Sequence, residues 1–168
     1  MNQKNPFLQG RLVDLSYSYS SETIFWPTEE GFKLYKEFDG LTDKGYYYSA
    51  NKFSLPEHGG THIDAPIHFS KGGKTIDQIP IDQLIAPVIV IDVSKKSQKN
   101  SDYQISYEDF TNWELSFGKI PEGVIVLLNT GHGKYWPNPL KYLGTEKKGN
   151  EALKDLHFPG LYPDAAKW

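Results

Sequence analysis

Residues 58–69 read HGGTHIDAPIHF, and they restrict the fold more than any other part of the chain. Two adjacent glycines separate the first two histidines and Pro66 precedes the third, so a continuous helix cannot form here. The segment must instead be a loop followed by a short extended stretch. In an extended stretch His62 and Asp64 project to one face, and the flexible glycine pair lets His58 fold back toward them.

These side chains are the ligand types of a divalent metal site. Three of the five histidines lie in this segment, and the chain has no cysteine. Neutral imidazole and carboxylate are the ligands that zinc and manganese accept when thiolate is absent. We therefore predict that His58, His62 and Asp64 bind one metal ion, with a position left for water as in catalytic zinc sites. His68 is either a fourth ligand or an acid/base that transfers protons.

Charge and hydropathy argue against two other classes of partner. The formal net charge is -3 and the charged residues are spread along the sequence, so no basic stripe is available for nucleic acid. No apolar run approaches the roughly 20 residues that span a bilayer, and residues 1–6 lack the apolar stretch of a signal peptide. We expect a single domain over residues 1–168 in the cytoplasm, with no nucleic-acid or membrane partner.

Short runs of β-branched and aromatic residues between turn residues predict strands. The expected strands are residues 11–19, 32–38, 46–55, 87–93 and 124–128. The second and third are joined by a turn sequence, which predicts an antiparallel hairpin. The last two are apolar almost throughout, so we expect both to be covered on two faces in a central sheet.

Helix signals complete an α/β (α+β) pattern. Ser106, followed three residues later by Asp109, is typical of a capped helix start and predicts a helix to about residue 115. This helix falls between the two apolar strands and predicts a strand–helix–strand crossover. Residues 94–104 are polar and predict a surface loop, and Pro163 begins the first turn of a last helix.

The twelve-residue segment resembles the signature of the putative cyclase family, which includes bacterial-type kynurenine formamidases and isatin hydrolases. Shorter segments that are similar to this family follow in the expected order: Asp14-Leu15-Ser16, Trp26-Pro27, Asp77-Gln78-Ile79-Pro80, Thr130-Gly131 and Phe158-Pro159-Gly160-Leu161. The resemblance covers most of residues 10–168. It implies a swivelling β/β/α fold, with a mixed central sheet and short helices, and a divalent metal, usually Zn²⁺ and Mn²⁺ in some members.

The resemblance also implies roles for individual residues. His58, His62 and Asp64 align with metal ligands, and Asp64 is the carboxylate that bridges two ions in the dinuclear members. His68 aligns with the general acid/base. Trp26 matches an aromatic residue that packs against an aryl substrate, although it could equally fill a gap beside Pro27. Family members commonly associate, so a homo-oligomer, a dimer or a tetramer, is expected.

One departure from the family pattern concerns the second metal ion. In the dinuclear members a histidine and a glutamate from a C-terminal segment complete that site, whereas this chain ends at Trp168, before that segment. We therefore expect a C-terminally incomplete fold, either a fragment or a natural short form, with one or two ions. His132 and His157 do not fall at the matching positions and are expected in loops.

The leading hypothesis is a metal-dependent hydrolase that cleaves a C–N bond in a small amide, formamide or cyclic amide, one attached to an aromatic ring. His68 would act as the general acid/base and the metal would activate water. The alternatives are a diverged or truncated non-catalytic protein that binds the metal and a small molecule, a purely structural ion, and an intramolecular cyclisation reaction.

Overall fold

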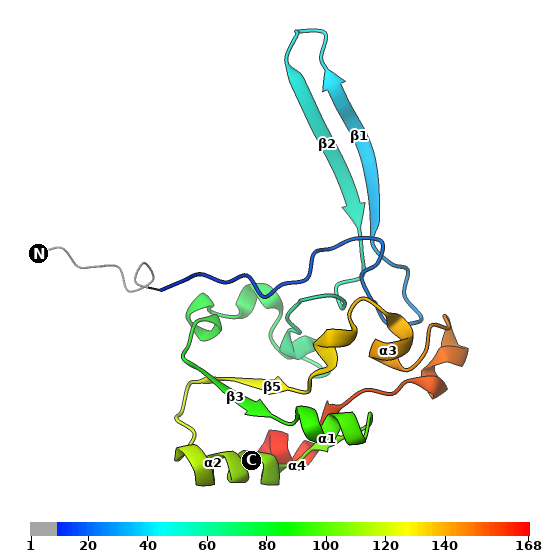
Figure 1. Cartoon of the computed structure of the whole chain (residues 1–168). Helices are drawn as coiled ribbons and strands as arrows, with labels where there is room; N and C mark the ends of the chain where they lie inside the picture. Colours follow the sequence, from blue (N-terminus) through cyan, green and yellow to red (C-terminus); the bar gives the residue numbers. More distant parts are fainter. Residues whose placement is uncertain (1–9) are drawn as a thin grey trace, which may run out of the picture.

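The computed structural model describes residues 10–168, which form a mixed α/β body with one projecting hairpin (Figure 1). The strands are β1 Lys33–Leu41, β2 Tyr47–Ser54, β3 Val88–Asp92, β4 Gln104–Ile105, β5 Ile125–Asn129 and β6 Gly160–Leu161. The α-helices are α1 Ser94–Lys99, α2 Tyr107–Phe117, α3 Pro139–Leu143 and α4 Pro163–Lys167. The 3₁₀ helices are η2 Pro66–His68, η3 Ile76–Gln78, η4 Ile81–Leu84, η5 His132–Tyr135 and η6 Asn150–Asp155. The α/β class predicted from the sequence is confirmed.

No helix within residues 10–168 is long and apolar enough to cross a membrane. Residues 1–6, which are predicted to lack the apolar stretch of a signal peptide, lie outside the described residues.

The predicted hairpin is confirmed as β1 and β2, which pair antiparallel. Leu34 lies opposite Phe53 at its base, and Leu41 lies opposite Tyr47 near its tip. The turn closes where the Thr42 amide donates a hydrogen bond to the Tyr46 carbonyl at 2.9 Å. Figure 1 shows the hairpin extending away from the other elements, so both of its faces are open over most of its length.

The body is built around β3 and β5, which pair parallel as the crossover predicts. Helix α2 connects them and begins with the predicted capping box, in which Ser106 and Asp109 each accept a hydrogen bond from the other's backbone amide. Figure 1 shows α2 and α4 on one side of this strand pair. The buried core lies between them and consists of Ile91, Val93, Ile105, Phe110 and Ala165.

The prediction that β3 and β5 are covered on both faces is wrong for the described part of the chain. Ile91 is buried on the face toward the helices, whereas Val88, Val90 and Leu127 are about half exposed. The strands are apolar on both sides, but the helices α2 and α4 cover only one. Instead of one mixed central sheet, the described residues form three separate two-stranded sheets, β1–β2, β3–β5 and β4–β6.

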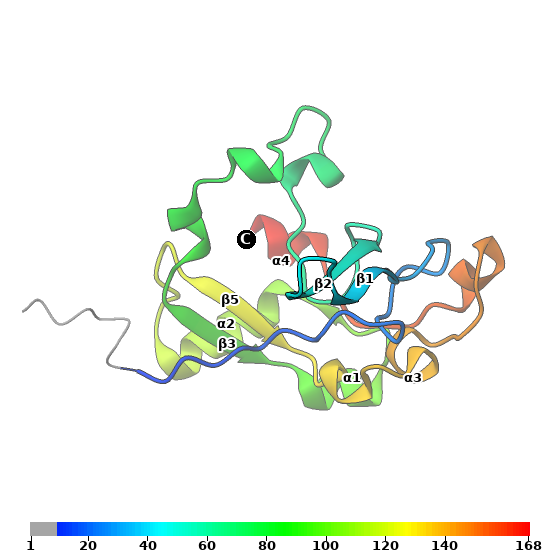
Figure 2. The same ribbon diagram turned by 90° about the horizontal axis from the view of Figure 1, so that it is seen from above.

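Residues 11–19 form no strand, contrary to prediction. The segment runs across the body without strand partners in the described residues, as both views show (Figures 1 and 2). Side chains hold it instead. The Tyr17 ring stacks on Trp136 with centroids 4.6 Å apart, and the Tyr17 amide donates to the Thr61 hydroxyl at 2.9 Å. A segment with alternating apolar residues forms a β-strand only when a neighbouring strand pairs with it. The sequence of the segment alone does not show whether such a neighbour exists.

The predicted surface loop at residues 94–104 is also corrected, because it contains helix α1 and the start of β4. The Asp92 carboxylate accepts a hydrogen bond from the Ser94 amide at 2.8 Å, which stabilises the first turn of α1. Ser97 on this helix is buried. The polar composition of residues 94–104 correctly indicated that most of α1 is exposed. It did not exclude a helix, because an exposed helix can be polar.

Candidate active site

The loop after β2 is fixed by its glycine pair. Gly59 forms an isolated antiparallel bridge with Phe25, and a side chain at Gly59 would lie 2.1 Å from the Phe25 ring. Gly60 has a φ of +63°, in the left-handed region that favours glycine. The close approach of the Phe25 ring requires glycine at residue 59, and the left-handed backbone favours it at residue 60. His58 and His62 lie on either side of this glycine pair.

A second turn returns the chain to the same point. Pro66 opens η2, where its missing amide leaves no donor unsatisfied. The His68 amide donates to the Ala65 carbonyl at 2.9 Å, and the Ile67 amide donates to the Lys74 carbonyl at 3.1 Å. These bonds hold η2 so that the His68 side chain lies beside His58.

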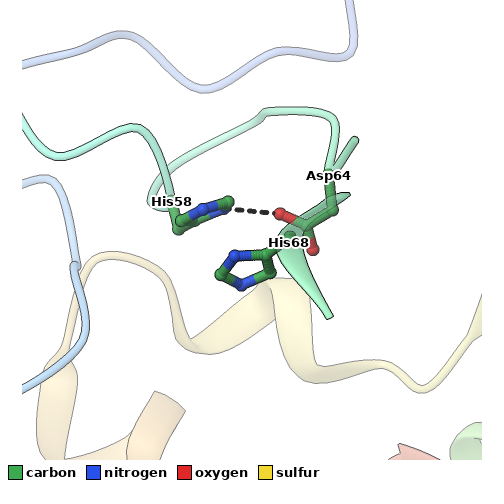
Figure 3. A group of neighbouring side chains, drawn as sticks. All are labelled: His58, Asp64 and His68. Carbon is green, nitrogen blue, oxygen red and sulfur yellow. Dashed lines mark hydrogen bonds and ion pairs between the residues drawn. The ribbon is translucent and has the colours of Figure 1, made fainter. Parts of the chain in front are cut away.

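His58, Asp64 and His68 form the centre of the site (Figure 3). His58 Nδ1 lies 2.6 Å from Asp64 Oδ1, and the rings of His58 and His68 stack with centroids 3.5 Å apart. One potential ligand atom from each of the three residues lies within 4.8 Å of the other two. Imidazole nitrogens and a carboxylate oxygen at this spacing fit a divalent ion such as Zn²⁺ or Mn²⁺.

His62 lies at the edge of this group. Its Nε2 is 3.2 Å from Asp64 Oδ1, and its Nδ1 is 3.1 Å from the Gly60 carbonyl oxygen. The backbone contact orients the ring and leaves Nε2 directed at the carboxylate, as second contacts do for metal-binding histidines. The structure thus brings the four predicted residues together. His58 and His62 are in direct contact with Asp64, and His68 has a potential ligand atom within 4.8 Å of it. Their individual roles stay predictions.

The electrostatics of the cluster favour an ionised carboxylate. Burial raises the pKa of Asp64, but the hydrogen bond from His58 and the nearby charge of His62 outweigh it, so the pKa lies below its ordinary value. A carboxylate that stays ionised near neutral pH is available to bind a cation.

The cluster opens into a pocket of about 810 Å³. Apolar and aromatic side chains form most of its wall, and the lining includes Ile24, Phe25, Trp26, Phe69, Trp136, Tyr142 and Leu143. Trp26 is 43% exposed and lies edge-on to Phe158, with centroids 6.2 Å apart. The structure places the predicted Trp26 in the same pocket as the histidines. Whether it binds substrate stays a prediction.

Sequence reasoning missed Trp136, Tyr142, Glu29 and Glu57, which also line this pocket. Trp136 stacks on Tyr17 and meets Tyr142 edge-on, with centroids 5.5 Å apart. The only sequence signal was a second Trp-Pro pair after Trp26, and it carried no indication of where the side chain lies.

His132 and His157 lie outside the cluster. They line a separate, smaller pocket of about 660 Å³. His157 Nδ1 lies 2.8 Å from Asp102 Oδ2 in an irregular segment, whereas His132 begins η5 rather than a loop. Burial lowers the pKa of His132, and its Nε2 is buried without a hydrogen-bond partner among the described residues. Neither histidine joins Asp64.

Comparison with known proteins gives matches over nearly the whole chain. The family model described as "Putative cyclase" matches residues 13–168. An isatin hydrolase of Roseibium aggregatum is 34% identical over 129 residues, which is 74% of this chain and 46% of that protein. A kynurenine formamidase of Salinibacter ruber is 28% identical over 113 residues, 67% of this chain and 53% of that protein. The chain thus spans about half the length of these curated relatives.

Solved structures give the same result at the level of the fold. An isatin hydrolase bound to the product analogue thioisatinate superposes with a TM-score of 0.75 and 29% identity, covering 92% of this chain and 61% of that one. Isatin hydrolase A from Labrenzia aggregata, bound to benzyl benzoate, gives a TM-score of 0.76 and 29% identity over 94% of this chain and 62% of that one. These matches confirm the fold predicted from the signature.

Proposed function

The chain belongs to the putative cyclase family, and we propose that it carries the active site of a metal-dependent hydrolase. The bond cleaved would be the C–N bond of a small amide, formamide or cyclic amide attached to an aromatic ring. Relatives named isatin hydrolase and kynurenine formamidase support this reaction class. The observation that carries the proposal is the juxtaposition of the His58–Asp64–His68 cluster with an aromatic pocket large enough for a small ligand.

His58, His62 and Asp64 are proposed to hold the divalent ion, most favourably Zn²⁺. Zn²⁺ or Mn²⁺, when bound, polarises the carbonyl of the substrate and lowers the pKa of water. The contact between the Asp64 carboxylate and His58 Nδ1 orients one ligand against the other.

His68 is proposed to move the protons of the reaction. A ring nitrogen would accept a proton from the attacking water and then return it to the leaving nitrogen, so that the amine departs neutral. The stacking of His68 on His58 fixes the plane of its ring, and its position at the end of η2 places it on the wall of the pocket. Histidine suits this role because its charge changes close to neutral pH.

The aromatic wall is proposed to hold the aryl group and to exclude water from the reacting bond. Trp26 and Trp136 come from distant parts of the chain and line the same cavity. Tyr17 and Tyr142 hold Trp136 by stacked and edge-on contacts. A rigid aromatic surface costs little entropy when it binds a flat ligand.

The direct test uses the purified full-length protein loaded with Zn²⁺ or Mn²⁺. We expect release of aniline and formate from formanilide, or opening of the isatin ring, at a rate that depends on the added metal. A protein that binds the metal in stoichiometric amount but releases no product from either compound would contradict the proposal. That outcome would favour the non-catalytic binding protein.

Association into a homo-oligomer is a separate proposal. The hairpin exposes large apolar side chains, among them Leu34, Tyr47 and Phe53, and a second copy of the chain is the partner expected to cover them. Light scattering after size-exclusion chromatography measures the mass directly. A monomer at concentrations well above those of the assays would refute it.

A further inference from the structure

A second cavity, of about 660 Å³, lies outside the candidate active site. Helix α1 and the η5–α3 segment, which are next to one another in Figure 2, supply most of its lining. No residue of its described lining also lines the first pocket, so the proposed reaction gives this cavity no role. The two segments are closely packed, because a Cβ at Gly131, just before η5, would lie 3.1 Å from the Cβ of Ser94, at the start of α1.

The charge of this lining is opposite in sign to that of the chain. The sequence has 21 acidic and 18 basic residues, but the described lining contains Lys99 and Lys141 and no carboxylate side chain. Within residues 10–168 neither lysine forms an ion pair, whereas Lys96, on the same helix as Lys99, pairs with Asp109. Two ammonium groups without a counter-ion beside one cavity attract anions to it.

The lining also contains two buried polar atoms that have no partner. Among residues 10–168 only three buried side-chain nitrogen or oxygen atoms lack a hydrogen bond, and Ser97 Oγ and His132 Nε2 are two of them. Both residues line this cavity, and Ser97 is only 4% exposed. Buried polar atoms are normally hydrogen-bonded, because an unpaired one loses its hydration without replacement. Their occurrence together in one cavity wall indicates a ligand that supplies the missing bonds.

Both atoms can donate a hydrogen bond to such a ligand. Rotation about the Cα–Cβ bond moves the Ser97 hydroxyl between staggered positions and can direct it toward the cavity. A neutral imidazole carries a hydrogen on one of its nitrogens, so His132 can donate from Nε2. His157 also lines the cavity but already has a partner, because its Nδ1 lies 2.8 Å from Asp102 Oδ2. Ser97 and His132 are therefore the buried donors that remain for a ligand.

Two ammonium groups combined with hydroxyl and imidazole donors are the chemistry that recognises phosphate. A phosphate monoester loses its second proton at a pKa of about 6, so above neutral pH its charge matches that of two lysines. Its terminal oxygens accept hydrogen bonds from several donors at once, whereas a carboxylate brings one charge and two oxygens. The cavity is larger than a phosphate ion, and Tyr135 and Leu140 in its lining can contact a small organic group.

We propose that this cavity is a second binding site, which takes a phosphate group, either free or esterified to a small molecule. Lys99 and Lys141 are its counter-ions, and Ser97 and His132 are its buried hydrogen-bond donors. The proposal goes beyond the hydrolase function and does not depend on it, because the two cavities share no lining residue. Its test measures binding and not turnover.

The test titrates the Zn²⁺-loaded full-length protein with three anions at about pH 8, where phosphates carry close to two charges. The anions are inorganic phosphate, glycerol 3-phosphate and methanesulfonate, which has a similar tetrahedral head but one charge. Two-dimensional NMR of the backbone amides gives the dissociation constants and locates the bound anion.

We expect at least one phosphate to bind with a dissociation constant of about 1 mM or lower, and about tenfold more tightly than methanesulfonate. Amide signals of residues 97–101 and 132–144 should shift. Equal affinity for methanesulfonate would overturn the proposal, and so would shifts confined to the loop around His58. Tighter binding of glycerol 3-phosphate than of inorganic phosphate would support an ester as the ligand, and the reverse order would support free phosphate.

Matched lysine variants assign the binding to this cavity. Lys99→Gln and Lys141→Gln should each weaken phosphate binding about fivefold, and the double variant should weaken it by more than about tenfold. Lys44→Gln, in the hairpin turn and outside the cavity, removes the same charge and should change the affinity by less than about twofold. Phosphate bound to the metal cluster instead would keep its affinity in the double variant, and that result would contradict the proposed site.

Ser97→Ala separates a binding role from a structural one. The variant removes a buried hydroxyl that has no partner, so urea denaturation should show no loss of stability. Phosphate affinity should nevertheless fall about tenfold, because a hydrogen bond to a charged group is lost. Unchanged phosphate affinity in Ser97→Ala would exclude its hydroxyl as a donor to the ligand.

Discussion

At the scale of single residues, the ring of His68 is close enough to Asp64 to bind a metal ion and is also placed for proton transfer. His68→Gln separates the two roles. If His68 is the acid/base, the variant should keep its metal while turnover falls roughly 10² to 10⁴ fold. Metal content by elemental analysis and steady-state rates measure the two effects. His157→Gln, outside the pocket, is the matched control, and loss of metal from His68→Gln would identify a ligand instead.

Asp64 is the shared neighbour of the histidines, since His58 and His62 both lie within 3.2 Å of Oδ1. Asp64→Asn keeps the size of the side chain and removes its charge. We expect Zn²⁺ affinity to fall by more than roughly 100-fold, because changes to residues behind the ligands already cost 10–100-fold. Calorimetric titration with Zn²⁺ measures this. Asp43→Asn in the hairpin turn should bind as the parent does, and an unchanged Asp64→Asn would exclude the carboxylate as a ligand.

Gly59 matters because of the space it leaves. A methyl group there would lie 2.1 Å from the buried ring of Phe25, so Gly59→Ala must displace either the ring or the loop that carries His58. We expect a loss of about 1–3 kcal/mol in the free energy of unfolding, measured by urea denaturation, together with weaker Zn²⁺ binding. Gly31→Ala, with no atom within 4 Å of the added carbon, should change neither.

At the scale of elements, helix α2 depends on Asp109, whose side chain is 3% exposed. Burial raises the pKa of Asp109, but hydrogen bonds from Lys96, Tyr103 and the Ser106 amide outweigh it, so the pKa lies below its ordinary value of 3.8. A carboxyl group whose pKa is lower in the folded than in the unfolded protein stabilises the fold at pH values above its pKa in the unfolded protein. This contribution is lost as the pH falls through the lower, folded pKa.

Asp109→Asn should therefore destabilise the protein by about 1–3 kcal/mol at neutral pH. The difference from the parent should narrow as the pH drops below 3.8. Urea denaturation over a series of pH values measures both effects. Glu108→Gln, exposed in the first turn of the same helix, should cost only a few tenths of a kcal/mol. A difference that stays constant down to low pH would contradict the assigned ionisation.

At the scale of the whole molecule, stability depends on a small core beneath β3 and β5, whereas the pocket lies on the segments around the base of the hairpin (Figure 1). Ile105 is 1% exposed and is the largest fully buried side chain among residues 10–168. Ile105→Ala should lower the free energy of unfolding by about 2–5 kcal/mol. Ile81→Ala, at a residue 76% exposed, should change it by less than about 0.5 kcal/mol. If urea denaturation gave the same loss of stability for Ile105→Ala and Ile81→Ala, the assignment of Ile105 to the core would be wrong.

The sequence by itself determined the local structures and the chemistry of the ligands. The glycine pair and Pro66 exclude a continuous helix over residues 58–69, where only the short η2 forms. Ser106 with Asp109 predicts the capped start of α2, as observed. The hairpin of β1 and β2 and the parallel pair of β3 and β5 were also predicted from patterns within short segments, and both are confirmed. Backbone preference, capping and alternation act over a few residues, so a single sequence contains them in full.

Only the tertiary structure decided which distant groups meet. It joined Trp26 and Trp136 in one pocket and placed Glu29 and Glu57 beside them. It also left residues 11–19 without a strand partner among residues 10–168. It also brought a potential ligand atom of His68 within 4.8 Å of those of His58 and Asp64. Contacts between residues far apart in the chain depend on how the elements pack, and the local pattern around each residue does not specify its partner.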